Sequence, residues 1–135
     1  MRFFLRFILV AGLSYVAGLY LPWWTAAIIG FLVGLSLSQK SENSRRRSFT
    51  KPRPPARAFL AGFLALFLLW GGLAYGLDSA NTSIMSEKIS QIILSGAQPP
   101  ISGTYVMLLV TGLMGGLIGG FSTMTGNLAG EAIRN

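Results

Sequence analysis

Four stretches of this chain are long, apolar and almost free of charge, and they constrain its fold more than any other feature. They cover residues 3–21, 23–38, 58–77 and 101–122, and the only charged side chain inside them is Arg6. A bilayer core of about 30 Å requires roughly 20 mostly apolar helical residues, so such stretches are typical of transmembrane helices. The sequence therefore predicts an all-α membrane protein, with residues 1–135 forming a single transmembrane domain of four transmembrane helices.

The first two stretches meet at Pro22, which is followed by Trp23 and Trp24. Proline removes a backbone hydrogen bond from a helix, and tryptophan is favoured at the membrane interface, so we expect a tight turn there. The four helices should then form two helical hairpins. The alternative for the first stretch is a cleaved signal peptide, because Arg2 and Arg6 resemble its basic region. The apolar run resumes directly after the turn, which favours a membrane span.

The basic residues indicate the orientation of these helices. The net charge is +7, from 11 Lys and Arg against 4 Asp and Glu. Seven of the 11 lie in residues 39–57: Lys40, Arg45, Arg46, Arg47, Lys51, Arg53 and Arg57. Basic residues accumulate in short cytoplasmic loops, so this loop should be cytoplasmic, and an even number of spans places both termini on the same side. Arg2, Arg6 and Arg134 agree with that orientation. Arg6 is interpreted as an anchor that extends to the headgroups, and the alternative is a buried charge that holds a ligand or a partner helix.

The same loop suggests a lipid contact. Six of its basic side chains are predicted to set the topology and to rest against anionic headgroups: Arg45, Arg46, Arg47, Lys51, Arg53 and Arg57. We expect no nucleic-acid partner, because Phe49 is the only aromatic residue in the loop and stacking platforms for bases need several. The predicted location is the cell membrane, multi-pass, in a bacterial inner membrane or its equivalent.

Small residues recur at four-residue intervals in two of the stretches. In lipid, helices associate mainly through close packing of small side chains and through interhelical hydrogen bonds. These rows, a glycine-zipper pattern, are therefore predicted to be helix-packing or partner interfaces. They comprise Ala26, Gly30, Gly34 and Ser38 in the second stretch, and Gly112, Gly115, Gly116, Gly119 and Gly120 in the fourth. A third interpretation of the fourth stretch is a polar path lined by Thr111, Ser122, Thr123 and Thr125.

The segment 78–100 is too long for a minimal turn and carries its own pattern. Met85, Ile89, Ile92 and Ile93 follow helical spacing, and Pro99 and Pro100 end the segment. The pattern predicts a short amphipathic extracytoplasmic helix that covers the end of the bundle, lies in the membrane interface or contacts a partner.

Several chemistries have no residues to carry them. The chain contains no Cys and no His, and its four carboxylates, Glu42, Asp78, Glu87 and Glu131, fall outside the four stretches. We therefore expect no catalytic, cofactor-binding or metal site and no enzymatic activity, since only Asp78, Glu87 and Lys88 remain as acid-base groups near the outer face. The predicted function is a non-catalytic accessory, assembly or structural subunit of a membrane complex, with a membrane-protein partner or self-association. The alternative is an oligomeric channel or transporter for a small solute.

Overall fold

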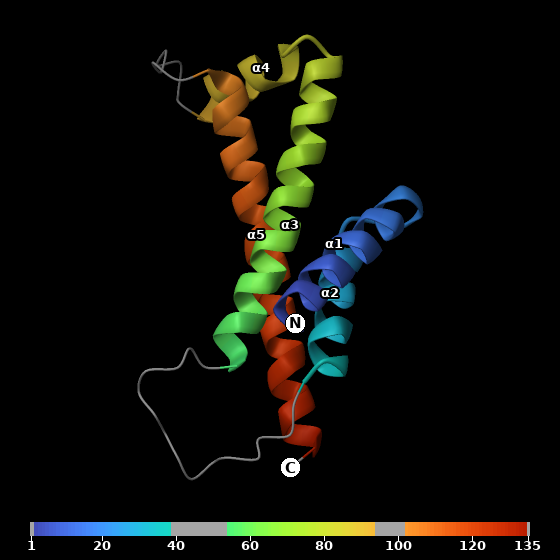
Figure 1. Ribbon diagram of the computed structural model, residues 1–135. Helices are drawn as coiled ribbons and strands as arrows, with labels where there is room; N and C mark the ends of the chain where they lie inside the picture. The colour runs from blue at the N-terminus through green and yellow to red at the C-terminus, as the bar shows by residue number, and fades with distance from the viewer. Residues whose placement is uncertain (1, 39–53, 94–101, 135) are drawn as a thin grey trace.

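The computed structural model describes residues 2–38, 54–93 and 102–134. Within these ranges the chain forms five helices and no strand (Figure 1). The helices are α1 (Arg2–Tyr20), α2 (Thr25–Ser36), α3 (Pro54–Ala80), α4 (Ile84–Ile93) and α5 (Gly103–Arg134).

A tight turn at Pro22 separates α1 from α2. The Thr25 N–H and the Thr25 hydroxyl both donate to the Pro22 carbonyl oxygen, at 3.0 and 2.8 Å, so Thr25 begins the new helix. Because the turn includes Trp23 and Trp24, α2 keeps only 12 residues, a length of about 18 Å. That length is well short of a bilayer core of about 30 Å.

The prediction of four transmembrane helices in two hairpins is therefore not confirmed. Among the described residues, three helices are long and apolar enough to cross a membrane: Phe3–Tyr20, Pro55–Ala80 and Gly103–Ile133. The short α2 is apolar but lies packed against α5. α4 lies between α3 and α5 in the chain, within the segment 78–100 where a short helix was predicted.

The helices α3 and α5 extend beyond the apolar stretches that predicted them. α3 begins at Pro54, four residues before the predicted start, because proline is accepted in the first turn of a helix. α5 continues to Arg134, 12 residues past the predicted end at 122, and reaches a length of about 48 Å. This polar continuation stays helical because it packs on α2, a tertiary contact that local hydropathy does not report.

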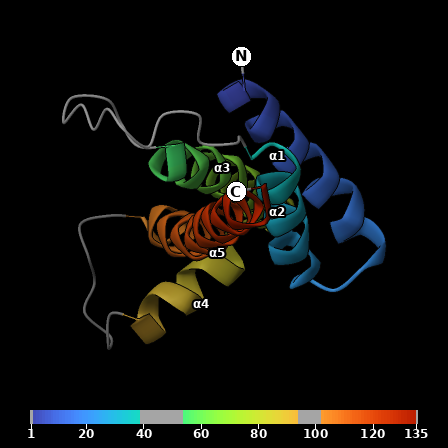
Figure 2. The same cartoon turned by 90° about the horizontal axis from the view of Figure 1, so that it is seen from below.

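The helices are arranged around α5. α3 and α2 both pack on α5, and α1 lies on the far side of α2 and α3 from α5 (Figure 2). α3 and α5 cross near the middle of α5 and diverge toward α4, which runs across their upper ends (Figure 1). The ends of α2 and α5 and the start of α3 therefore lie at the end of the molecule opposite α4.

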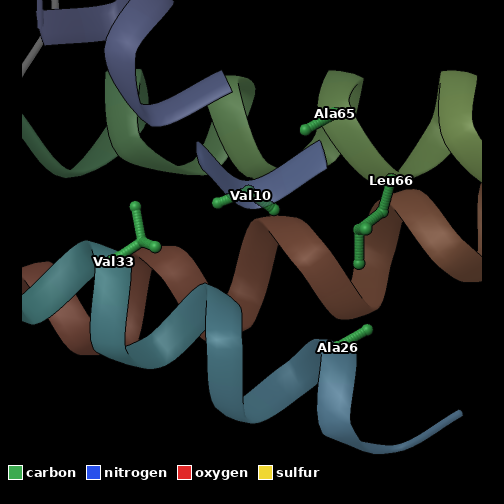
Figure 3. Close-up of a cluster of buried hydrophobic side chains, with 5 residues drawn as sticks. All are labelled: Val10, Ala26, Val33, Ala65 and Leu66. Atoms are coloured by element: carbon green, nitrogen blue, oxygen red, sulfur yellow. The ribbon is translucent and has the colours of Figure 1, made fainter. Parts of the chain in front are cut away.

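The interior is made of small and polar side chains. The apolar core cluster consists of Val10, Ala26, Val33, Ala65 and Leu66, contributed by α1, α2 and α3 (Figure 3). The buried polar side chains include Arg6, Asp78, Thr123 and Asn127. Many large apolar side chains are instead exposed, with no protein covering them, among them Ile8, Leu68, Met114 and Phe121. A soluble monomer rarely exposes so much contiguous apolar surface, but a lipid-facing exterior requires it. The fold is that of a helical protein suited to a membrane.

Candidate helix-packing site

The contact between α3 and α5 is a row of aromatic rings laid over a row of glycines. Phe59, Phe63 and Phe67 repeat every four residues along α3, and neighbouring rings stack with centroids 5.8 and 5.7 Å apart. The pairs are Phe59 with Gly120, Phe63 with Gly116 and Phe67 with Gly112, where an added Cβ would lie 2.6, 2.8 and 3.0 Å from the ring. The two helices thus run antiparallel in a fixed register, and each glycine leaves room for one ring.

A second row on α5 fits the adjoining face of α3. A Cβ at Gly115 would lie 2.8 Å from the indole of Trp70, and one at Gly119 would lie 2.8 Å from the Cγ of Leu66. Gly119 and Gly62 of α3 approach backbone to backbone, so neither position has space for a side chain. All five predicted glycines of the fourth stretch therefore face α3 of the same chain.

Further along α5, the same small-residue face receives α2. A Cβ at Gly34 would lie 2.9 Å from the backbone nitrogen of Asn127, and it would also meet the carbonyl of Thr123. Gly30 lies over Ser122 and Thr123, and Gly126 of α5 lies against the backbone of α2 near Leu35. Since backbone atoms cannot rotate away as side-chain ends can, these positions of the α2–α5 contact have no space for a side chain.

Thr123 sits where the two glycine faces meet. Its side chain is fully buried, and its hydroxyl oxygen has no conventional hydrogen-bond partner in the described residues. A Cβ on Gly30 would lie 3.2 Å from that oxygen, and Gly62 also approaches it closely. A Cα–H of each glycine therefore points toward that oxygen, a weak contact that recurs at close helix–helix interfaces.

Arg6 forms the polar part of the site together with α2 and α5. Its guanidinium, in a side chain only 6% exposed, donates from Nη2 to the Leu37 carbonyl at 2.8 Å and to Asn127 Oδ1. Asn127 Nδ2 donates in turn to Glu131 Oε1 at 2.7 Å, and the Ser38 hydroxyl donates to the Asn127 carbonyl at 2.9 Å. The anchor interpretation of Arg6 is wrong, because its side chain turns inward and joins three helices rather than extending to the headgroups.

The remaining predicted positions are distributed as follows. Ala26 belongs to the apolar core cluster, and Ser38 belongs to the Arg6 cluster. Arg57 is exposed in the first turn of α3. Arg45, Arg46, Arg47, Lys51 and Arg53 lie outside the described residues.

The three carboxylates in the described residues, Asp78, Glu87 and Glu131, all lie near helix ends. Asp78 is in the last turns of α3 and only 2% exposed. Its Oδ1 accepts the Ser86 N–H at 3.2 Å and its Oδ2 accepts the Thr104 hydroxyl at 3.1 Å. A carboxylate at the first turn of α4 complements the helix dipole and satisfies a free backbone donor. Asp78 therefore joins α3, α4 and α5 through hydrogen bonds. It is one of the three residues considered as acid-base groups, and both of its carboxylate oxygens accept these hydrogen bonds.

The hydroxyl groups of α5 do not line a common path, in contrast to the polar-path interpretation. Ser122 donates its hydroxyl to the Gly119 carbonyl at 3.2 Å, and Thr125 donates to the Phe121 carbonyl at 2.8 Å on the exposed side. Thr123 is buried between helices, so these hydroxyls point to different faces. In the described ranges, no three Asp, Glu, His or Cys side chains gather where they would hold a metal ion.

Sequence reasoning missed the residues opposite the glycines. The four-residue spacing of Phe59, Phe63 and Phe67 is visible in the sequence and matches the spacing of the glycines they cover. The pair Gly126 and Gly130 likewise continues the small-residue pattern of α5, and both approach α2 closely. The inward turn of Arg6 and its contact with Asn127, 121 residues away, had no comparable signal.

Fold and site together define an all-helical protein with apolar helices long enough to span a membrane, held by glycine faces and a buried arginine cluster. Comparison with known protein families, with curated proteins and with solved structures found no match for this chain.

Proposed function

We propose that the chain is a non-catalytic accessory or assembly subunit of a membrane complex, and that its partner is a transmembrane helix received on the upper half of α3. The observation that carries the proposal is that three glycines there are left open. Gly71, Gly72 and Gly76 have no atom within 4 Å of an added Cβ, unlike the glycines of α5 and of the lower half of α3.

Two hollows flank this open surface. One, of about 270 Å³, lies between α3 and α5 and is lined by Gly71, Gly72 and Leu108 among others. The other, of about 320 Å³, lies between α3 and the α1–α2 turn and includes Leu73, Leu77 and Trp23. Glycines four residues apart permit close helix approach, and hollows on both sides offer room for the larger side chains of an incoming helix.

The proposal places the protein in a cell membrane with the segment between α2 and α3 on the cytoplasmic side. Nine of the 11 basic residues lie in that segment or near the ends of the chain, and a tenth, Arg57, lies in the first turn of α3. The arrangement supports a common side, because the start of α3 and the ends of α2 and α5 lie at one end of the molecule (Figure 1).

Co-purification from native membranes tests the role and the surface together. Gly72→Leu fills open space, so thermal unfolding of the purified protein should be unchanged while the partner is lost several-fold. Gly12→Leu is the matched control, because Gly12 is equally open but lies on α1. Equal recovery of partners with both variants would refute the proposed surface.

Two further results would refute the accessory role itself. If only copies of this chain are recovered, self-association is the occupant of the surface. If reconstituted liposomes take up ions or small solutes above protein-free controls, the channel or transporter function replaces the accessory one.

A further inference from the structure

α4 is attached to the rest of the protein through its polar side. Ser86 is fully buried and Ser90 is 8% exposed, and both face the start of α5. The Ser86 and Thr104 hydroxyls lie 3.3 Å apart, and an added Cβ on Gly103 would lie 2.7 Å from both the Ser86 carbonyl and the Ser90 hydroxyl. Gly103 thus allows α4 to approach α5 closely with its serines inward.

The apolar side of α4 consequently points away from the protein. Ile84 and Met85 are each 57% exposed and Ile92 is 78% exposed. At about 100° per residue these three lie within one arc of the helix, and Lys88, also exposed, falls inside the same arc. The usual arrangement of a surface helix, with its apolar side against the core and its polar side outward, is reversed here.

The position of α4 identifies what covers this side. α4 crosses the upper ends of α3 and α5, the two longest of the helices able to span a membrane (Figure 1). Tyr75, near the end of α3, is 59% exposed, and Tyr105, near the start of α5, is 63% exposed. Tyrosine concentrates at the boundary between headgroups and acyl chains, so these two side chains mark that boundary at the level of α4.

We propose that α4 lies in the plane of the membrane and docks on the lipid surface itself. Ile84, Met85 and Ile92 enter the boundary between headgroups and acyl chains, and the Lys88 ammonium binds a lipid phosphate. An apolar face with a central basic side chain is the chemistry by which interfacial helices bind bilayers. Asp78 and the two serines hold α4 in this orientation from the other side.

Single-cysteine spin labelling tests the orientation, and the chain contains no native cysteine to remove. The variants Ile92→Cys and Glu87→Cys carry the label on the apolar side and on the exposed polar side of the same helix. In proteoliposomes the label at 92 should be more accessible to oxygen than to a water-soluble nickel complex, and the label at 87 should show the reverse. Because both positions are exposed, neither label should disturb the fold.

Two outcomes would overturn the proposal. If both labels are readily accessible to the nickel complex, α4 lies in water. If the label at 92 is shielded from both reagents, protein covers the apolar side, and a distance measurement between labels would show whether that protein is a second copy.

The lysine contact is tested separately in vesicles with and without an anionic phospholipid. The label at 92 should lie deeper when anionic lipid is present, and the additional substitution Lys88→Gln should abolish that difference. Ser79→Gln is a control that changes an exposed position outside α4. A depth that is the same in both vesicles with Lys88 intact would refute phosphate binding by Lys88.

Discussion

At the scale of single residues, the buried Arg6 cluster joins parts of the chain that are distant in sequence. Replacing Asn127 with Leu removes the acceptor of one Arg6 hydrogen bond and the donor to Glu131. A buried polar group deprived of its partner costs about 1–3 kcal/mol. We expect Asn127→Leu and Arg6→Leu each to lower the free energy of unfolding by that amount, measured by denaturant titration in detergent micelles.

The double variant separates the interaction from the side chains. Because the two residues contact each other, Arg6→Leu with Asn127→Leu should cost less than the two single losses added together. Arg57→Leu, at an exposed arginine in the first turn of α3, serves as the control and should change stability little. Additive losses in the double variant would contradict a direct Arg6–Asn127 contact.

The sequence indicated that Arg6 was unusual but not where it pointed. A charge one turn from the start of an apolar helix can reach the headgroups, and hydropathy alone favours that outcome. Its inward turn depends on the end of α2 and on Asn127, which the fold brings together. Asn127 lay beyond the predicted end of the last helix, so no local pattern connected the two residues.

At the scale of helices, the glycines differ in what surrounds them, so replacing each with alanine should change the stability by a different amount. At Gly34 the methyl meets backbone atoms of α5, at Gly116 it meets the ring of Phe63, and at Gly72 it meets nothing. Overpacking costs about 1–3 kcal/mol when the neighbour cannot move. Gly34→Ala should therefore lose that much stability, Gly116→Ala should lose less because the ring can shift, and Gly72→Ala should lose none.

Thermal unfolding of the purified variants in one detergent measures this order. Gly116→Leu extends the series, since a leucine cannot share the space of the Phe63 ring, and it should separate α3 from α5. A Gly72→Ala variant as unstable as Gly34→Ala would show that the upper half of α3 is packed against protein within the chain.

The carboxylate of Asp78 should control α4 without affecting the rest of the molecule. Asp78→Ala removes the acceptor of the Ser86 N–H and of the Thr104 hydroxyl. Hydrogen bonds to a charged group contribute about 1.5–3 kcal/mol, so amide hydrogens of α4 should exchange roughly tenfold faster or more. Hydrogen exchange with mass spectrometry resolves α4 peptides from those of the lower bundle. Asp78→Asn, which keeps one acceptor oxygen, should give a smaller increase, and equal acceleration across all helices would contradict a local role.

At the scale of the whole molecule, the apolar runs were sufficient to predict helices long and apolar enough to span a membrane, but they predicted four where the described residues contain three. The second run, 23–38, was long enough only if Trp23, Trp24 and Ser38 were helical, and the turn at Pro22 and the end at Ser36 exclude them. The α2 glycines were recognisable by their spacing. Their partner segment on α5 was not, because residues 123–130 are too polar for a hydropathy criterion and stay helical through contact with α2.

The arrangement of the long helices predicts which ends share a side of the membrane. α3 and α5 are about 40 and 48 Å long, so both exceed a core of about 30 Å and their ends should project into water. Single cysteines at Arg57 and Ile133 mark one end and a cysteine at Glu87 marks the other, in a chain with no cysteine of its own. A membrane-impermeant maleimide added to intact cells should label Glu87→Cys alone, and permeabilisation should expose Arg57→Cys and Ile133→Cys together. The opposite pattern would reverse the orientation derived from the basic residues, whereas different behaviour at 57 and 133 would contradict the antiparallel crossing of α3 and α5.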